Sequence, residues 1–189
     1  MTCFDAMITI VEPDPRWSSE FDAVAARLYD AAEEGIVRID HVGSTSVPLP
    51  AKDVIDVQVT VADDEALERI AASLAAQTWR SADIDRDHQV PGFPTAPAEW
   101  RKAFFVEPEG ERRINVHVRV QGRANQRYAL LFRDFLRTHP EAARAYAEVK
   151  RGLAVLARDL DSYADAKDPA CDLIYVAAEI WAQDEAWVP

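Results

Sequence analysis

The chain has 189 residues, of which 49% are hydrophobic and 29% charged, so it can bury a sizeable core and global disorder is excluded. It carries 21 Lys and Arg against 33 Asp and Glu, and this formal net charge of −12 disfavours electrostatically driven binding to nucleic acid or to an anionic membrane. The two cysteines, Cys3 and Cys171, lie far apart in sequence, so we expect no disulfide framework and a reducing compartment.

The beginning of the chain carries no recognisable targeting signal. Its first ten residues, MTCFDAMITI, lack a positive region followed by an apolar stretch. No apolar run in the sequence approaches the roughly 18 residues needed to cross a bilayer. We therefore expect a cytoplasmic protein that does not contact a membrane.

Strand and helix patterns alternate through the first part of the chain. Apolar alternation and β-branched residues predict strands over 8–11, 37–42, 54–61 and 113–120. Helical spacing of apolar residues predicts one helix from Trp17 that stops before Gly35 and a second around 67–74. Three prolines between Gln89 and Pro97 predict a surface excursion, because proline does not fit inside a helix or a central strand.

The second part of the chain is predicted to be helical. From about Gln126 onward apolar residues recur at helical spacing, and we expect Pro140 and Pro169 in the first turns of two helices. Together the patterns predict an α+β fold in a single domain over 1–189. Its sheet-containing half is expected over 1–122 and its helical half over 123–189.

The turn after the strand predicted at 37–42 is the first candidate for ligand binding. Gly43 lacks a Cβ, so its backbone can approach a ligand closely, and Ser44 and Thr45 add hydroxyl groups beside backbone amides. Such a turn can hold phosphate oxygens. A lone Gly-Ser-Thr is more often an ordinary tight turn, and the segment lacks the Lys-terminated pattern of a Walker loop.

Two polar strand residues are candidates for chemistry. Asp56 shares one strand face with Gln58, and an unpaired buried carboxylate there is costly. Mg²⁺, Lys52 or solvent could be its partner, so a metal or catalytic site competes with a structural ion pair and with a solvated sheet face. In strand 113–120, His117 lies on the polar side and could act as base, metal ligand or hydrogen-bonded structural residue.

The predicted helices contribute basic residues that could bind an anion. Two pairs, Tyr146 with Lys150 and Tyr163 with Lys167, are spaced i to i+4 and therefore share a helix face. With Arg133 they could close over an anionic ligand. Alternatively, Arg133 pairs with a core acid and the lysine stems lie along the tyrosines at the surface.

Among the histidines outside the strand at 113–120, we expect His41 to be structural and to fix the turn at Gly43. His88 and His139 have no comparable sequence context.

Short motifs follow one another in a fixed order along almost the whole chain. They are Pro15-Arg16-Trp17, His41 to Pro48, Ala51-Lys52, Ile55-Asp56-Val57, Arg101, Phe104-Phe105, Val116-His117-Val118, residues 132–136, Tyr146 with Lys150, and Tyr163 with Lys167. This ordered set resembles the GrpB-like family of the nucleotidyltransferase-fold superfamily. The resemblance implies a nucleotidyltransferase-like mixed β-sheet with flanking helices. Because members also occur fused to dephospho-CoA kinase, it implies a kinase of that type as a candidate protein partner.

The resemblance also implies roles for individual residues. Active nucleotidyltransferases hold a triphosphate at a Gly-Ser turn and bind Mg²⁺ ions through carboxylates. The implied catalytic residues are Asp56 as metal ligand or base, Lys52 as countercharge and His117 as base or ligand. The implied ligand-binding residues are Gly43, Ser44, Thr45, Asn115, Arg133, Tyr146, Lys150 and Lys167. The implied cofactor is Mg²⁺ or Mn²⁺.

Two departures from the family pattern weaken the implied catalysis. Gln58 stands at the second carboxylate position, and the third strand offers Asn115 and His117, so a full two-metal carboxylate set is absent. The loop before Lys52 is also one residue shorter than usual and lacks the glycine of the family.

The sequence therefore supports two leading functions. The first is a nucleotidyltransferase-fold protein that binds a nucleotide or another phosphorylated small molecule and carries out Mg²⁺-dependent nucleotidyl transfer. The alternative is a non-catalytic binding or partner-assisting module that has lost the full metal site. An RNA-modifying enzyme is disfavoured by the acidic charge and by the lack of a basic patch with interleaved aromatic residues, so no nucleic-acid partner is expected.

Overall fold

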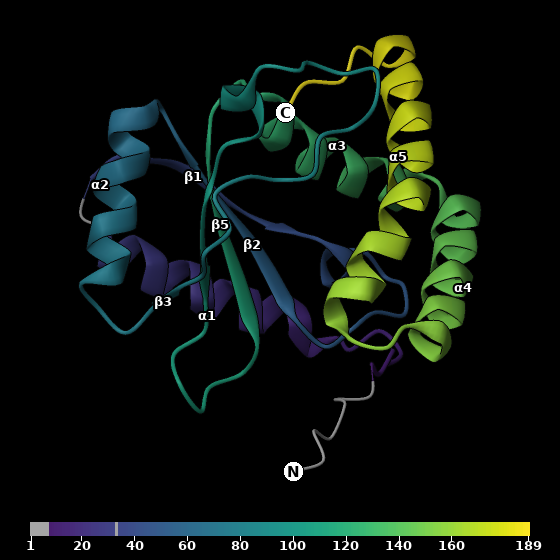
Figure 1. Ribbon diagram of the computed structural model, residues 1–189, viewed down its shortest axis with the longest axis horizontal. Coiled ribbons are helices and arrows are strands. Elements are labelled where there is room, and N and C mark those ends of the chain that lie inside the picture. Colours follow the sequence, from purple (N-terminus) through teal and green to yellow (C-terminus); the bar gives the residue numbers. More distant parts are fainter. Residues whose placement is uncertain (1–7, 33) are drawn as a thin grey trace.

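The computed structural model describes residues 8–32 and 34–189 and places a mixed β-sheet between two groups of helices (Figure 1). Within these residues the sheet has five strands in the order β1-β2-β5-β4-β3. They are β1 (Ile36–Val42), β2 (Ile55–Val61), β3 (Arg80–Ser81), β4 (Ala103–Val106) and β5 (Ile114–Val120). β2 and β5 run parallel, whereas the other neighbours pair antiparallel. The predicted α+β class is confirmed.

The helices cover the two faces of the sheet unequally. They are α1 (Arg16–Ala31), α2 (Asp64–Ala75), α3 (Ala124–Thr138), α4 (Pro140–Leu156) and α5 (Leu160–Asp184). The first two lie on one side of the sheet, and the last three form a group on the other side (Figure 1). The helix predicted to stop before Gly35, the helix around 67–74 and the helical second half are confirmed.

The apolar face of the two central strands builds the first core. Val57 and Val59 of β2 and Val116 and Val118 of β5 are fully buried and pack against α1 and α2. Because side chains alternate along a strand, the residues between these valines point to the opposite side of the sheet. The predicted two-faced character of both strands is confirmed.

A second apolar cluster lies within the helical group. It joins side chains of α3, α4 and α5 with Leu49, Val90 and Trp100 from the connecting segments. The polar faces of β2 and β5 look toward this second cluster. The polar residues of both strands therefore lie in an interior layer between two apolar clusters, and this layer holds the candidate site.

Two expected elements differ from the structure. Residues 8–11 form no strand but a single bridge, Val11 to Ala51. Beyond Val11 the ladder cannot extend toward residue 13, because Pro13 has no N–H group for the next hydrogen-bonded pair.

Pro169 lies inside α5 and not in a first turn. The helix begins earlier because Asp159 and Ser162 form a capping box there, with the Asp159 side chain accepting from the Ser162 backbone N–H. Pro140 does occupy the first turn of α4, as predicted.

The segment 89–97 runs over the surface without regular structure until a short 3₁₀ turn (Pro97–Trp100), which confirms the predicted excursion. Val90 is the exception, because its side chain is buried in the second apolar cluster.

In the part of the chain that the structure describes, none of the helices combines the length and the apolar character that a membrane crossing requires.

Candidate ligand-binding site

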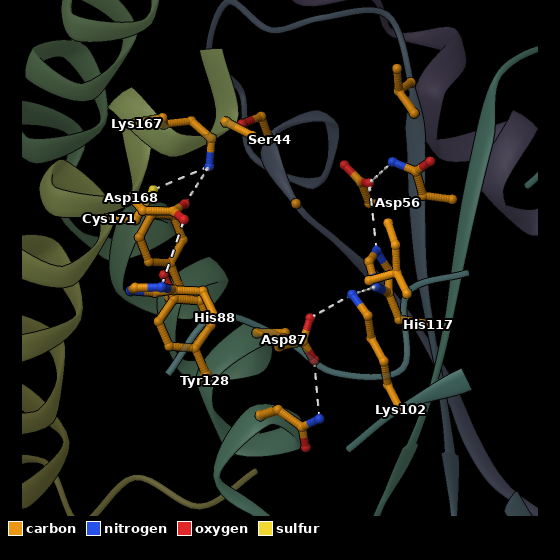
Figure 2. Close-up of a pocket in the computed structure, with 18 of the residues that line it drawn as sticks. Ser44, Asp56, Asp87, His88, Lys102, His117, Tyr128, Lys167, Asp168 and Cys171 are labelled. Carbon is orange, nitrogen blue, oxygen red and sulfur yellow. Dashed lines mark hydrogen bonds and ion pairs between the residues drawn. The ribbon is translucent and has the colours of Figure 1, made fainter. Parts of the chain in front are cut away.

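A cavity of about 490 Å³ lies between the polar face of β2 and β5 and the helices α3, α4 and α5. Its size is typical of small-molecule sites. Figure 2 shows Lys167, Asp168 and Cys171 of α5 on one side, facing Asp56 and His117 of the strands on the other. The site residues proposed from the sequence that line this cavity are Gly43, Ser44, Lys52, Asp56, Asn115, His117, Tyr146, Lys150 and Lys167.

Thr45 and Arg133, also expected to bind the ligand, do not lie on the cavity wall. The Thr45 hydroxyl donates to the Val54 carbonyl at 2.9 Å and contacts His41 at 3.0 Å, so it fixes the turn after β1. Arg133 bonds Asp40 at 3.3 Å and the His41 carbonyl at 3.1 Å. Both side chains make structural contacts. Arg133 pairs with the buried acid Asp40, which is the alternative considered from the sequence.

Gly43 is placed where no other residue fits. Its φ of +67° lies in the left-handed region, and an added Cβ would lie 2.3 Å from Oδ2 of Asp56. The strand pairing explains this closeness, because Val42 at the end of β1 pairs with Asp56 on β2. The turn at Gly43 and the carboxylate of Asp56 are therefore in such close contact that neither can change without moving the other.

Asp56 is held by neighbours on the adjacent strand. Asn115 donates to Oδ1 of Asp56 at 2.7 Å, and Nε2 of His117 lies 3.9 Å from the same oxygen. Burial raises the pKa of Asp56, but the contacts with His117 and Asn115 and the charge of Lys52 outweigh it, so the pKa lies below its ordinary value. The carboxylate is ionised at neutral pH and faces the cavity.

His117 is held as a neutral imidazole whose Nδ1 accepts from its neighbours. Its Nδ1 lies 3.4 Å from the Lys102 ammonium and 3.3 Å from the Arg119 guanidinium, and both of these groups are obligate donors. Burial and the charges of Arg119 and Lys102 lower the pKa of His117 to about 4. The lone pair therefore sits on Nδ1, and the N–H of Nε2 points to Asp56. A role as general base is disfavoured, because this lone pair is already bound by two cations.

A carboxylate that the sequence did not single out organises the same wall. Asp87, from the segment between β3 and β4, accepts from Arg119 at 2.8 and 2.9 Å, from Lys102 at 2.8 Å and from Asn125 at 3.0 Å. Burial raises the pKa of Asp87, but the charges of Arg119 and Lys102 prevail and hold it well below its ordinary range. Asp87 thus neutralises the cations beside His117. It comes from an aperiodic segment, so no sequence pattern marked it.

Gln58 stands where a second catalytic carboxylate would be expected, and its side chain is not available to a ligand. Gln58 is fully buried, accepts from Arg119 at 2.7 Å and donates to the Gln126 carbonyl at 3.2 Å. Within the described residues no group of three or more His, Cys, Asp or Glu side chains could hold a metal ion. Asp56 alone remains as a carboxylate ligand, so these residues do not fit a two-metal centre held by the protein.

Lys150 is the exceptional group of the helical wall. Its side chain is 2% exposed, and its Nζ has no hydrogen-bond partner. The ammonium lies 4.8 Å from the ring centre of Tyr146. Burial, followed by repulsion from Lys167, lowers the pKa of Lys150 to about 7.

Two more lysines surround Lys150. The Lys52 ammonium lies over the ring of Tyr163 at 4.8 Å, and Lys167 donates to Sγ of Cys171 at 3.4 Å. Burial lowers the pKa of Lys52, and the charge of Lys167 lowers it further. Both i to i+4 pairs thus face the cavity, and the lysine stems do not lie along the tyrosines at the molecular surface.

His88, which the sequence did not single out, lies on the cavity wall. Figure 2 shows its side chain beside Asp168, which lies 3.8 Å from the ring, and the ring also contacts Asp172 at 3.1 Å, both on α5. It therefore ties the segment between β3 and β4 to the helical wall. His41 is structural, as expected: its ring stacks on Phe21 at 4.8 Å.

The cavity wall has the opposite charge to the whole chain. It carries seven Lys and Arg side chains and three Asp side chains, a formal excess of +4, whereas the chain as a whole carries −12. The positive residues are Lys52, Arg86, Lys102, Arg113, Arg119, Lys150 and Lys167. A low-dielectric cleft with such a wall attracts small anions.

Comparisons with known proteins agree with this architecture. The chain is 36% identical to a dephospho-CoA kinase of Mycolicibacterium paratuberculosis over 97% of its own length but only 49% of the kinase, so it spans about half of that relative. It is 36% identical to the UPF0157 protein of Halalkalibacterium halodurans, over 86% of this chain and 78% of that protein.

Solved structures show the same fold. The conserved protein GrpB from Enterococcus faecalis superposes with a TM-score of 0.71 at 26% identity, covering 92% of this chain and 99% of that one. The Cid1 poly(U) polymerase superposes with a TM-score of 0.50 at 13% identity, over 83% of this chain and 49% of that one, and so shares the nucleotidyltransferase-like fold alone. The family described as GrpB protein matches residues 7–176. The chain therefore belongs to the GrpB family.

Proposed function

We propose that this protein binds a small phosphorylated molecule in the cavity between the sheet and the helical half, with a nucleotide as the first candidate. The observation that carries the proposal is the Lys150 amine: this residue lines the cavity, and its nitrogen is buried and has no hydrogen-bond partner. A buried polar group without a partner costs free energy, and an anionic oxygen beside it removes that cost. Lys52 and Lys167 add positive charge at the same end of the cavity.

Further features of the wall suit the rest of such a ligand. Gly43 and Ser44 form a turn whose backbone the phosphate oxygens of a ligand can approach closely. Trp100, Tyr128 and Phe132 add aromatic surface on the same wall, against which a base or another planar group can pack.

The proposal favours binding over nucleotidyl transfer. The buried contacts of Gln58 with Arg119 and Gln126 leave Asp56 without a second carboxylate, and His117 is not free to act as a base. A Mg²⁺ or Mn²⁺ ion would have to arrive with the phosphates of the ligand and take most of its oxygen ligands from them.

Calorimetric titration with pyrophosphate and with ATP, each in EDTA and in Mg²⁺, tests this proposal. We expect pyrophosphate binding in EDTA and a loss of about ten-fold or more in affinity in Lys150→Met, because a hydrogen bond to a charged group contributes roughly 1.5–3 kcal/mol. Arg144→Met is the matched control, since it removes one positive charge from an exposed side chain. Absence of pyrophosphate binding in the unaltered protein, or equal affinities of the two variants, would contradict the proposal.

The relatives favour a second candidate, a module that assists a separate dephospho-CoA kinase. The match to such a kinase extends over 97% of this chain and about half of the kinase. The test is cosedimentation of this chain, under reducing conditions, with a dephospho-CoA kinase that lacks a GrpB region. A stable complex supports this candidate, and independent sedimentation at micromolar concentrations argues against it.

A further inference from the structure

The distribution of lysine in this protein is unusual. The sequence contains four lysines among its 21 basic residues, and all four line the cavity: Lys52, Lys102, Lys150 and Lys167. The positive charges elsewhere on the described chain are carried by arginine. An arginine keeps its proton at any physiological pH, whereas a lysine can lose it and become a nucleophile. The cavity therefore concentrates every side-chain amine of the protein in one place.

The four amines have different surroundings. The Lys102 ammonium donates to Asp87 at 2.8 Å, and Lys167 donates to Cys171 at 3.4 Å. Lys52 lies over the ring of Tyr163 and is attracted by Asp56. Of these four lysines, only Lys150 has a buried nitrogen without a hydrogen-bond partner, and the residue is 2% exposed.

The surroundings of Lys150 favour the neutral amine. Water is largely excluded, and the positive charges of Lys167 and Lys52 repel an ammonium at this position, so the pKa falls to about 7. Desolvation and a neighbouring cation are the two devices by which proteins activate a lysine as a nucleophile. The same neighbouring cations attract a phosphate, which would place a phosphorylated compound next to the amine.

We propose that Lys150 forms an imine with a phosphorylated aldehyde or ketone whose phosphate lies against Lys52 and Lys167. This inference rests on the proposed function, because it requires the cavity to bind the phosphate of the compound. The nitrogen lone pair attacks the carbonyl carbon and forms a C–N bond, and a proton passes from nitrogen to the carbonyl oxygen. The resulting carbinolamine then loses its hydroxyl group and the second N–H proton as water, leaving a C=N double bond without any change of oxidation state.

The probe is pyridoxal 5′-phosphate, a phosphorylated aldehyde, followed by reduction with sodium borohydride and peptide mass mapping of the full chain. Borohydride supplies the hydride that converts the imine into a stable secondary amine. We expect Lys150 to be labelled at least about ten-fold faster than Lys52, Lys102 or Lys167, because a pKa lowered to about 7 gives it the largest neutral fraction. Pyridoxal, which has the aldehyde without the phosphate, should label Lys150 far more slowly at equal concentration.

Two comparisons make the result decisive. Lys150→Arg keeps a positive charge at this position but cannot form an imine, so it should lose the label. The mapping of the unaltered protein needs no variant, so a folding defect in Lys150→Arg does not spoil the test. Equal labelling of all four lysines would overturn the imine proposal. If pyrophosphate still binds in that case, the proposed function stands; if it does not, both fail.

Discussion

Gly43 lets the carboxylate of Asp56 occupy its position by having no side chain. A Cβ at residue 43 would lie 2.3 Å from Oδ2 of Asp56 and 2.7 Å from its Cβ. The carboxylate cannot retreat freely, because Asn115 donates to its other oxygen at 2.7 Å. Any side chain at residue 43 must therefore move the turn, the carboxylate or both.

Gly43→Ala should lower the free energy of unfolding by about 1–3 kcal/mol, the usual cost of a non-glycine residue held at an unfavourable backbone conformation. It should also weaken pyrophosphate binding, since Ser44 and Asp56 share the displaced region. Gly92→Ala is the control: its φ of +87° imposes similar backbone strain, but no atom lies within 4 Å of the added Cβ. Urea unfolding and calorimetry on both variants check this; equal loss of binding in both would show that the contact with Asp56 is irrelevant.

The two buried histidines make stability depend on pH. The pKa values of His41 and His117 are both lowered to about 4, chiefly by burial. Between pH 4 and their unfolded value of about 6.5 the unfolded chain binds these protons and the folded chain does not. The stability present above pH 6.5 is therefore lost as the pH falls toward 4.

As the pH falls through this range, we expect each of the two histidines to lower the free energy of unfolding by up to about 1.4 kcal/mol per pH unit. His117→Asn, which retains a donor for Asp56, should remove one of these contributions and flatten the profile between pH 6.5 and 4. Denaturant unfolding at several pH values measures it. A variant profile parallel to that of the unaltered protein would exclude His117 as a source of the dependence.

Among the elements, the segment between β3 and β4 connects the two walls of the site. Asp87 reaches Arg119 and Lys102 at the sheet, while His88 reaches Asp168 and Asp172 on α5. Adjacent residues of one segment thus bind opposite sides of the cavity. The segment has little regular structure of its own, so these contacts determine its position.

Asp87→Asn should destabilise the fold by about 3 kcal/mol, because it leaves the buried Arg119 and Lys102 side chains without their shared countercharge. Asp85→Asn is the matched control two residues away, with a side chain that is 76% exposed and paired with Arg86. The control should change stability by less than about 0.5 kcal/mol, as is usual for exposed positions. Thermal and denaturant unfolding compare them. Equal stabilities of the two variants would refute the structural role of Asp87.

Elements with strong periodicity could be predicted from the sequence, and irregular ones could not. The strands β2 and β5 alternate over seven residues each, and the valines on one face of both are buried as expected. β3 has two residues and β4 has four, too few for a period to be recognised. Pro169 is expected in a first turn because proline is over-represented there, whereas the capping box at Asp159 starts α5 earlier.

The site could be predicted only in part, for the same reason. Gly43, Asp56 and His117 lie on or next to strands, so their faces followed from alternation, and all three line the cavity. Asp87 and His88 belong to an aperiodic segment, and their partners on β5 and α5 are distant in sequence. Long-range pairing of this kind is fixed by packing and leaves no local pattern.

For the whole molecule, the central feature is a positive cavity inside an acidic chain. The wall has a formal excess of +4, and the chain has −12. The acidic exterior keeps polyanions such as nucleic acid at a distance, whereas the enclosed cations act at short range on a ligand small enough to enter. This combination supports the proposed binding of a small phosphorylated molecule rather than a polymer.

The buried lysine of the cavity wall also lowers the stability of the protein. Lys150 keeps an amine in a dry site without a hydrogen bond, which costs free energy as long as no anion is present. Sites that are built for a ligand commonly carry such a cost, and replacing their polar groups often stabilises the empty protein.

The most direct test of this account is the thermal unfolding of the unaltered protein and of Lys150→Met at pH 6, each with and without pyrophosphate. The account predicts that Lys150→Met is more stable than the unaltered protein without ligand, by about 1–3 kcal/mol, because it removes a buried unpaired amine. It also predicts that pyrophosphate at one hundred times the Kd of the unaltered protein stabilises that protein by about 2.7 kcal/mol and raises its melting temperature by several degrees. The variant, with at least about ten-fold weaker binding, should gain about 1.4 kcal/mol or less at the same concentration. A variant that is less stable without ligand and gains as much from pyrophosphate as the unaltered protein would contradict it.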